Sequence, residues 1–525
     1  MLAAGAFPGD RMARGSLAAL DGRAFDVVVV GAGLNGISAA QHLAAAGYSV
    51  GLFEQNDFFS GASSRSSRML SCGIRYLERG QSMWAFLRQP HFLYASLKMA
   101  RQAMQMRSQF INTAPERVKK LQFAFPIYDT DYYKPWQVKL APGDVPIDFR
   151  MAPPKEIPNL PLVNLMRNRE RMLGAALFRE YHFDWPERVA MDTVLDAERM
   201  GAVVRNYTPV TGMRRDADGA WRLALADKLA PGAEATVGAM AVLNMAGTWI
   251  DKVNAMASGE VKRKIQGTKG VHIAVRMPPG LEYHGVMGHH REGEHLYCFP
   301  WRDFHYFGPT ETLFEGSTDD IRATDDEIDW IIAEANYLFP SLDLKREDVL
   351  FSWAGVRPLS YDPRYPKGLR DRIVHDLAAE GLPNVFAMTA GPIMSHRSAG
   401  PVMVEHVAKV VKPSGQPQAI DYSARKFPEN QNAPPILDHW TEAKMSDLQH
   451  VARHEYPASL TDAIRRVGVL WTPTMAGEAA HRAARAIAPE MGWDEARAEK
   501  EAGDFLAYLA HTHRRGPDGL VPRGQ

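Results

Sequence analysis

The stretch DVVVVGAGLNGISAAQHLAAAGYSVGLFEQNDFFSGASSRSSRMLSCGIRYLER, residues 26–79, decides the fold. Its four consecutive valines, Val27–Val30, are β-branched and too few for a helix, so they predict a buried parallel strand. Three glycines follow at GxGxxG spacing: Gly31, Gly33 and Gly36. An alanine-rich segment, Ile37–Ala46, then predicts a helix, and Ser49–Phe53 predicts a second strand. The result is a strand–helix–strand unit.

This unit predicts dinucleotide binding. The glycines permit a tight turn and a close approach of the backbone to a pyrophosphate, which then lies at the helix N-terminus. Glu54 ends the second strand 18 residues after Gly36, where a carboxylate accepts hydrogen bonds from an adenosine ribose. An ordinary glycine-rich turn would not require the strand, the helix and the acid in this order. On these residues alone, NAD and FAD both remain open.

The next segment suggests a family. SSRSSRMLSCGIRYLE, residues 63–78, resembles the flavin loop of FAD-dependent glycerol-3-phosphate dehydrogenases and oxidases, usually written SSxSSKLxHGGLRYLE. The matching positions are Ser63, Ser64, Ser66, Ser67, Gly73, Arg75, Tyr76, Leu77 and Glu78. Three positions differ: Arg68 replaces a lysine, Ser71 a histidine and Cys72 a glycine.

Further motifs extend the resemblance over residues 26–509. NMAGTW (244–249) resembles the family's second FAD contact, and AGVRPL (354–359) matches a family motif closely. GTKGVHIAV (267–275) resembles the family's KGxH strand, and GWDEAR (492–497) its C-terminal helical domain. Two nucleotide-binding segments about 200 residues apart fit FAD better than NAD, because FAD lies extended along the domain.

The resemblance implies an α/β fold with three domains. The first is a discontinuous, Rossmann-like FAD-binding domain of the glutathione-reductase and D-amino-acid-oxidase type, formed by residues 24–80, 165–268 and 350–412. The second is an α+β substrate domain of residues 81–164 and 269–349, and the third a small C-terminal helical domain of residues 430–515.

The same resemblance implies the site residues. We expect the cofactor to contact Gly31, Gly33, Leu34, Asn35, Gly36, Glu54, Gln55, Ser63, Ser64, Ser66, Ser67, Ser71, Cys72, Gly73, Ala246, Gly247, Trp249, Arg357 and Gly391. We expect an anionic substrate to contact Arg75, Tyr76, Arg357 and Arg370. His272 is the expected catalytic base, since an imidazole accepts a proton near neutral pH, and Arg370 the second expected catalytic residue. Pro392 stands where the family has a phosphate-binding lysine, so one phosphate ligand is missing.

The histidines between residues 284 and 295 raise the question of a metal site. His284, His289, His290 and His295 are irregularly spaced among glycines. This pattern favours a solvated hairpin tip over a set of metal ligands, so we expect no metal.

Composition narrows the class of partner. Lys plus Arg and Asp plus Glu each total 61, which gives no electrostatic reason to expect nucleic acid. Two cysteines suit a reducing compartment, and no apolar run approaches the roughly 20 residues that span a bilayer. We therefore expect a cytoplasmic protein, with peripheral contact to the inner membrane and a homodimer left open. Residues 1–23 indicate a disordered leader or an upstream start and not a signal peptide, and the terminal LVPRGQ resembles the remnant of a protease site, with a native segment as the alternative.

The remaining segments predict local structure. We expect helices over Trp84–Lys119 and Glu187–Met200 and a hairpin formed by Val203–Val210 and Trp221–Leu225. Two helix starts carry capping signals, Thr324 with Glu327 and Ser459 with Asp462.

Taken together, the sequence predicts an FAD-dependent oxidoreductase. We expect it to oxidise glycerol 3-phosphate or a related polyol phosphate to the ketone, of the dihydroxyacetone phosphate type, by hydride transfer to flavin, with quinone or oxygen as electron acceptor. Two alternatives remain: an FAD-dependent oxidase of another anionic hydroxy or amino acid, and a flavin-binding module without turnover.

Overall fold

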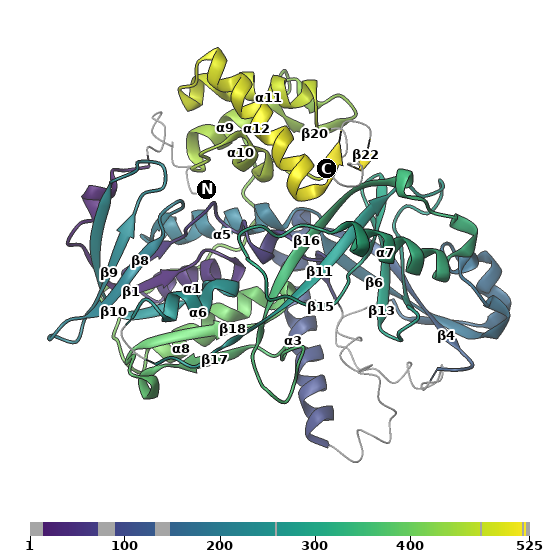
Figure 1. Ribbon diagram of the computed structural model, residues 1–525, viewed down its shortest axis with the longest axis horizontal. Coiled ribbons are helices and arrows are strands. Elements are labelled where there is room, and N and C mark those ends of the chain that lie inside the picture. Colours follow the sequence, from purple (N-terminus) through teal and green to yellow (C-terminus); the bar gives the residue numbers. More distant parts are fainter. Residues whose placement is uncertain are drawn as a thin grey trace.

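The computed structural model describes residues 14–71, 90–131, 148–257, 260–472, 475–516 and 519–520. Two β-sheets lie side by side, and a helical domain formed by the C-terminal part of the chain covers both (Figure 1).

The first sheet has a parallel core. In spatial order its strands are β18 (Val385–Thr389), β10 (Glu234–Asn244), β1 (Ala24–Val30), β2 (Val50–Phe53) and β7 (Val203–Arg205). Three antiparallel strands extend it: β17 (Ile373–Asp376) beside β18, and the hairpin β8 (Val210–Arg215) and β9 (Trp221–Ala226) beside β10. The predicted Rossmann-like α/β fold is confirmed.

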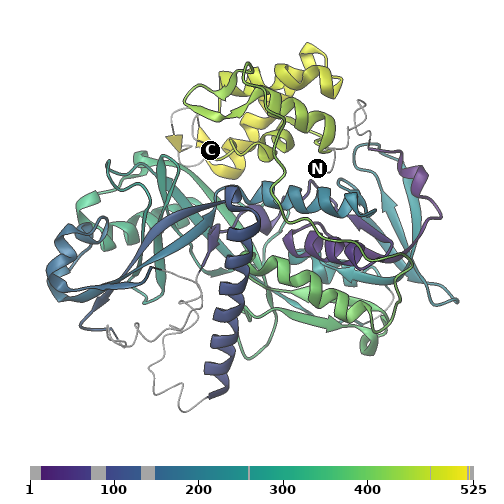
Figure 2. The ribbon, with the colours of Figure 1, turned by 180° about the vertical axis from the view of Figure 1, so that it is seen from behind.

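The valines of β1 are buried on both faces of this sheet. Val27 and Val29 pack with the helices α1 (Leu34–Ala45), α5 (Pro186–Arg199) and α8 (Ala399–Val407). Figure 2 shows these three helices side by side. Val28 and Val30 pack on the opposite face, against the β8–β9 hairpin. A strand covered on both faces needs a continuous apolar run, which is why four valines are adjacent.

The second sheet is larger and mostly antiparallel. Its order is β15 (Thr312–Leu313), β11 (Ile265–Val275), β14 (Phe304–Gly308), β13 (His295–Trp301), β12 (His284–His289), β4 (Val118–Tyr128), β6 (Met172–Phe183) and β3 (Met69–Leu70). In addition, β16 (Val349–Ser360) pairs with β11, and β5 (Arg150–Ala152) with β6. Helix α7 (Asp325–Leu338) packs on one face and the helical domain on the other.

Strands β3, β6 and β16 belong to the second sheet, although the predicted boundaries group their residues with the FAD-binding domain. Ladder hydrogen bonds along almost the whole of β11 hold β16 there, and β6 pairs with β4 in the same way. AGVRPL (354–359), one of the motifs that carry the resemblance, lies within β16 and therefore in the second sheet. The division into domains stays a prediction.

The helices follow their capping signals. α7 begins after Thr324 and α10 (Leu460–Arg466) after Ser459, and each start has the predicted capping box. The other helices are α3 (Pro90–Thr113), α6 (Ile250–Asn254), α9 (Met445–His454), α11 (Glu478–Met491) and α12 (Glu495–His513), and the short remaining strands are β19 (Pro435–Leu437), β20 (Trp440–Lys444), β21 (Arg515–Gly516) and β22 (Gly519–Leu520).

Two local predictions need correction. The helix expected over Trp84–Lys119 ends at Thr113, because Pro115 begins a short turn that leads into β4. The segment Val203–Val210 does not form one arm of the hairpin: its first residues are the parallel strand β7, and the hairpin begins at Val210. The break falls at Tyr207, whose φ of +50° ends the extended conformation.

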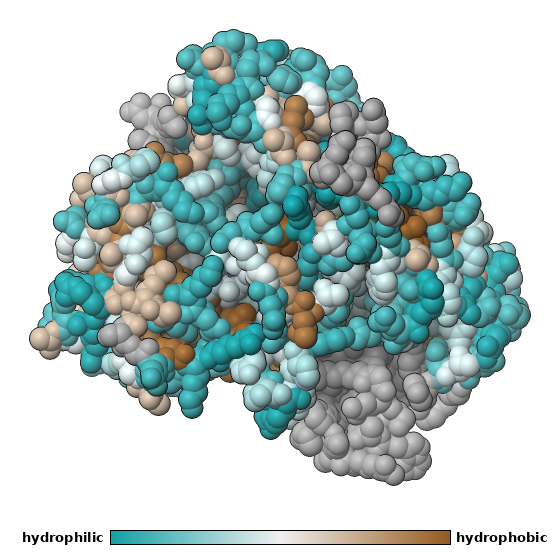
Figure 3. Space-filling model, in the orientation of Figure 1, coloured by the Kyte–Doolittle hydropathy of each residue, from teal (hydrophilic) through white to brown (hydrophobic). Residues whose placement is uncertain are grey.

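The surface is mixed. Hydrophilic residues dominate the face in Figure 3, with apolar ones in small groups between them. No helix in the described ranges is both long enough and apolar enough to cross a membrane. Among those same residues no cluster of three or more His, Cys, Asp or Glu is placed to hold a metal ion. β12 and β13 form a hairpin, but its histidines are not solvated as predicted: His290 is buried edge-on against Trp330, and His284, His289 and His295 are partly buried.

Candidate active site

The glycine-rich turn brings three segments together at the end of β1. Gly31 has a φ of +100°, and a Cβ there would lie 2.8 Å from Ala246 Cα, which follows β10. A Cβ on Gly36 would clash with the carbonyl oxygen of Gly31. Gly33 caps α1 without a side chain. Only glycine allows this packing, which leaves the N-terminus of α1 open at the C-terminal edge of the parallel strands, where such folds bind their ligands.

Glu54 lies beside this turn. Its Oε2 accepts a hydrogen bond from Ala32 N–H (2.8 Å) and its Oε1 one from Asn56 N–H (2.9 Å). Burial raises the pKa of Glu54, and the two N–H donors partly offset that effect. The carboxylate retains lone pairs for further donors, as a ribose requires. Gln55 is half-buried beside it.

The serine loop closes over the helix terminus. Ser63 Oγ accepts a hydrogen bond from Leu34 N–H (3.0 Å), in the first turn of α1. Ser64 is buried and donates to Gly61 O (3.2 Å), and Ser66 Oγ accepts from Arg68 N–H (3.1 Å). The loop hydroxyls are therefore beside the positive end of a helix, which suits a pyrophosphate.

Two further segments contact the first turn of α1 and the serine loop. Asn35 Nδ2 donates to Ala390 O (3.3 Å), so the loop after β18, which includes Gly391, contacts the first turn of α1. Gly247 has a φ of +60°. Trp249 lies 3.5 Å from the position of a Cβ on Gly61 and donates to Asp319 (3.1 Å).

His272 lies on β11 and is buried. Its Nε2 is 2.9 Å from Ser67 Oγ, so it contacts the same serine loop. Its ring stacks on Trp353, with centroids 4.8 Å apart, and Tyr306 meets it edge to face. Its buried Nδ1 has no hydrogen-bond partner among the described residues. Burial, and then the guanidinium groups of Arg357 and Arg68, lower the pKa of His272 well below its usual value, so the ring is neutral at pH 7 and can accept a proton.

Arg357 lies on β16 beside this histidine. Thr268 is its partner on β11, and Gly270 leaves the space that its guanidinium group fills, because a Cβ on Gly270 would clash with it. Side chains of alternate residues share one face of a strand, so Gly270 and His272 face the same side. The structure thus brings a guanidinium group and a neutral imidazole together.

Of the remaining predicted site residues, two have carboxylate partners and four lie outside the described residues. Arg370 is exposed and forms an ion pair with Glu311. Ser71 is buried and donates to Glu180 (3.4 Å), which also pairs with Arg107. Cys72, Gly73, Arg75 and Tyr76 lie outside the described residues.

Two arginines were not predicted as site residues. Arg68 is buried between Trp301 and Trp471, with its guanidinium carbon 4.0 Å and 4.6 Å from the ring centroids. The sequence signals it only as a replaced lysine. Arg372 donates to Ser398 Oγ (2.7 Å) and to Ser395. Its signal was the pattern Arg-Asp-Arg, which puts a second arginine on the same side as Arg370 in an extended segment.

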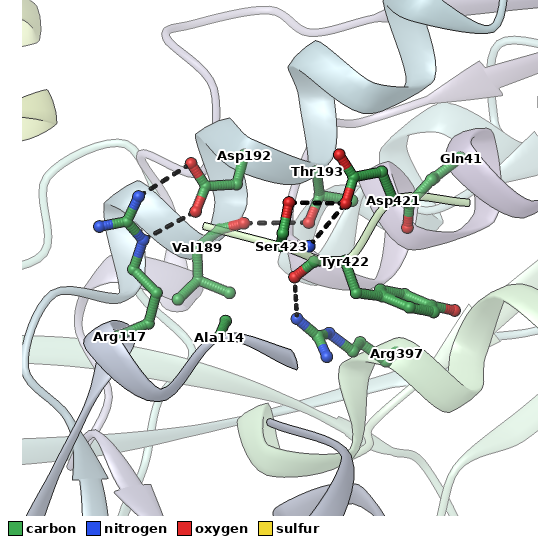
Figure 4. Close-up of a pocket in the computed structure, with 10 residues that line it drawn as sticks. All are labelled: Gln41, Ala114, Arg117, Val189, Asp192, Thr193, Arg397, Asp421, Tyr422 and Ser423. Carbon is green, nitrogen blue, oxygen red and sulfur yellow. Dashed lines mark hydrogen bonds and ion pairs between the residues drawn. The ribbon is translucent and has the colours of Figure 1, made fainter. Parts of the chain in front are cut away.

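A small polar cavity is separate from these residues (Figure 4). Its volume is about 10 Å³, which suits a single water molecule and not a nucleotide. It is lined by Gln41, Ala114, Arg117, Val189, Asp192, Thr193, Arg397, Asp421, Tyr422 and Ser423.

The family of FAD dependent oxidoreductases matches residues 26–405, and the chain belongs to this family. Its cofactor is therefore FAD. The observed groups fit it: the glycine turn admits a pyrophosphate, Glu54 has lone pairs for a ribose, and the serine loop beside that turn contacts His272.

The relatives are more specific. The chain is 30% identical to glycerol-3-phosphate dehydrogenase of Synechocystis sp. over 414 residues, 75% of this chain and 72% of the relative. It is 29% identical to D-erythritol 1-phosphate dehydrogenase of Brucella abortus, over 71% of each chain. The fold is similar to that of glycerol-3-phosphate dehydrogenase from Bacillus halodurans complexed with FAD, with a TM-score of 0.71 and 21% identity over 97% of this chain and 98% of that one.

Proposed function

We propose that the protein oxidises the secondary alcohol of glycerol 3-phosphate or a related polyol phosphate to a ketone. Two relatives named as dehydrogenases of such phosphates support this substrate class. The observation that carries the proposal is the pairing of a buried, neutral His272 with the guanidinium group of Arg357. The first group accepts a proton and the second binds an anion, as this reaction requires.

In the proposed reaction the protein residues accept a proton, orient the base and bind the phosphate. FAD, when bound, accepts the hydride from the carbinol carbon. His272 Nε2 takes the hydroxyl proton, from the side on which Ser67 Oγ now lies at 2.9 Å. Trp353 and Tyr306 hold the imidazole ring in this orientation. Arg357 binds the phosphate, joined by Arg75, Tyr76 and Arg370 in the proposed set.

The electron acceptor, the assembly and the location belong to the same proposal. The resemblance to glycerol-3-phosphate dehydrogenases and oxidases supports quinone or oxygen as the acceptor. It also supports a cytoplasmic enzyme with peripheral contact to the inner membrane, and a homodimer. Oxygen uptake measured with and without a soluble quinone distinguishes the two acceptors.

Bleaching of the flavin absorbance tests the substrate class. The purified, FAD-loaded protein is mixed anaerobically with glycerol 3-phosphate, other polyol phosphates, 2-hydroxy acids and amino acids. We expect polyol phosphates to bleach the flavin and the acids to leave it oxidised. Bleaching by a hydroxy or amino acid alone, or by no compound, would contradict the proposal.

A histidine variant tests the base. We expect His272→Gln to retain FAD and to bleach about 10²- to 10⁴-fold more slowly, the usual effect of a general base. His284→Gln, on β12 of the same sheet, is the matched control, since His284 bonds only within its own turn, to Glu282 O (2.9 Å), in the described structure. Equal rates in both variants would exclude His272 as the base.

A further inference from the structure

Arg372 is a partly buried cation that forms no ion pair in the described part of the chain. Its Nη1 donates to Ser398 Oγ (2.7 Å), and its Nη2 to the carbonyl oxygen (2.8 Å) and hydroxyl (3.2 Å) of Ser395. Its Nε is buried without a partner, and no carboxylate in the described part of the chain pairs with it. Burial lowers the pKa of Arg372 to about 10, so the group is still charged at neutral pH.

Some buried arginines in this structure have carboxylate partners, whereas Arg397 is held by a hydroxyl and a carbonyl oxygen. Arg466 pairs with Asp57 at 2.6 Å and Arg188 with Glu455 at 2.5 Å. Arg372 is held by serine oxygens, without the acid that Arg466 and Arg188 have. A buried charge without a counter-ion is costly, so such a site favours the approach of negative charge.

Arg372 lies against the loop after β18, which contains Gly391 and is part of the predicted FAD site. Its Nε lies 2.9 Å from the place of a Cβ on Gly391, which has a φ of +90°. The adjacent Ala390 donates to Pro358 O (2.8 Å), next to Arg357, and accepts from Asn35 in the first turn of α1. Arg372 thus supports a loop that contacts both the first turn of α1, where the pyrophosphate is expected, and β16, the strand beside His272.

The helix behind this loop adds to the positive field. A 3₁₀ turn, Ile393–Ser398, leads into α8, and both serine partners of Arg372 lie in it. A helix N-terminus carries partial positive charge, so a cation is unfavourable there unless an anion or an electron-rich group is bound nearby. Pro392, at the start of the turn, supplies no charge of its own.

We propose that Arg372, acting through the Gly391 loop, stabilises the negative charge that the flavin ring gains on reduction. The oxidised ring is neutral, and a hydride brings two electrons and one proton, which leaves one negative charge while the hydroxyl proton goes to the base. A cation close to the ring favours the charged state and raises the reduction potential. Arg372 is thus a positioning residue for the cofactor.

The geometry favours the flavin over the phosphate of a substrate. An arginine that binds phosphate uses two parallel N–H groups of its planar fork. In Arg372 both Nη atoms are already bonded to Ser395 and Ser398, which leaves only Nε. One N–H and a diffuse positive field suit a delocalised ring charge better than a compact dianion.

Sulfite binding and the flavin midpoint potential test this role. Sulfite adds through sulfur to N5 of oxidised flavin and leaves the ring with a negative charge, so its affinity reports the same field. We expect Arg372→Met to weaken sulfite binding at least tenfold and to lower the two-electron potential, a tenfold change being about 30 mV. Arg372→Lys should recover most of both. Arg364→Met removes an exposed arginine from the same segment and should change neither.

The outcomes are distinct. Unchanged sulfite affinity and potential in both Arg372 variants would overturn the proposal. An unchanged potential with weaker inhibition by inorganic phosphate would also overturn it and assign Arg372 to the substrate's anion. If Arg372→Met fails to retain FAD, Arg372→Lys decides through its potential relative to Arg364→Met. Both measurements use FAD and sulfite alone, so they do not depend on which alcohol the protein oxidises.

Discussion

The buried ion pair between Arg466 and Asp57 connects α10 to the loop after β2, which is part of the predicted FAD site. Arg466 Nη2 donates to Asp57 Oδ1 at 2.6 Å and Nη1 to Oδ2 at 3.0 Å, and the two side chains are 0% and 3% exposed. Asn206 also donates to Asp57 (3.0 Å). Asp57 follows Glu54 by three residues, so this pair fixes the loop beside the expected ribose site.

Arg466→Met leaves the Asp57 carboxylate buried without its counter-ion. Removing one partner of a buried pair costs about 3–5 kcal/mol, because the remaining charge keeps its desolvation penalty. Arg466→Met with Asp57→Leu removes both charges, and we expect the double variant to lose much less than the sum of the single ones. We also expect the Met variant to release FAD at a lower urea concentration than the parent.

Urea titration followed by flavin and tryptophan fluorescence measures both effects. Lys500→Met is the control, because it removes an ion pair with Asp504 in which the side chains are 60% and 57% exposed. A pair of this kind contributes about 0.3–0.5 kcal/mol. Equal shifts for Arg466→Met and Lys500→Met, or strict additivity in the double variant, would refute the reasoning.

Three further predictions concern the site and its stability. Gly36→Ala should yield folded protein without flavin absorbance, since its Cβ would clash with Gly31 O; a normal flavin content would contradict the glycine argument. The acid limb of kcat/KM should fall below pH 6.5, because the lowered pKa keeps His272 neutral down to lower pH; a limb above 6.5 would exclude it. Burial lowers the pKa of His396 to about 3, so the folded protein binds this proton less readily than the unfolded chain and stability falls as the pH drops below 6.5. His396 should account for about 1.4 kcal/mol of that loss for each pH unit from 6.5 toward 3, and His396→Phe should reduce the slope in urea titrations by that amount, while other buried histidines such as His182 and His305 keep the rest.

Part of the fold could be predicted from the sequence because it depends on interactions between residues close together in the chain. The strand Val27–Val30, the glycine turn and the two capping boxes each depend on residues close together in the chain, so their spacing predicts them. The sheet to which β16 belongs depends instead on β11, which precedes it by more than 70 residues. No short pattern in the sequence specifies that pairing.

The same contrast between short-range and long-range interactions applies to the site residues. Motif resemblance indicated that Arg357 and Arg370 are site residues, but not which side each faces. Arg370 lies in a surface ion pair with Glu311, while Arg372, two residues later, is partly buried and donates to Ser395 and Ser398. Those serines follow Arg372 by 23 and 26 residues, and only the packing of the turn before α8 against the loop brings them together.

Besides burial, the cations around His272 lower its pKa, and a bound anionic substrate should change that pKa during the proposed reaction. Arg357 and Arg68 lower the pKa of the free imidazole and, by the same field, attract an anionic substrate. Once a phosphate dianion binds Arg357, it cancels part of that field, so the pKa of His272 rises when the hydroxyl proton must be accepted. Because kcat reports the complex and kcat/KM the free enzyme, the acid limb of kcat should lie at higher pH than that of kcat/KM. Coincident limbs would show that the bound anion does not act on His272, and Arg357 would then not be its ligand.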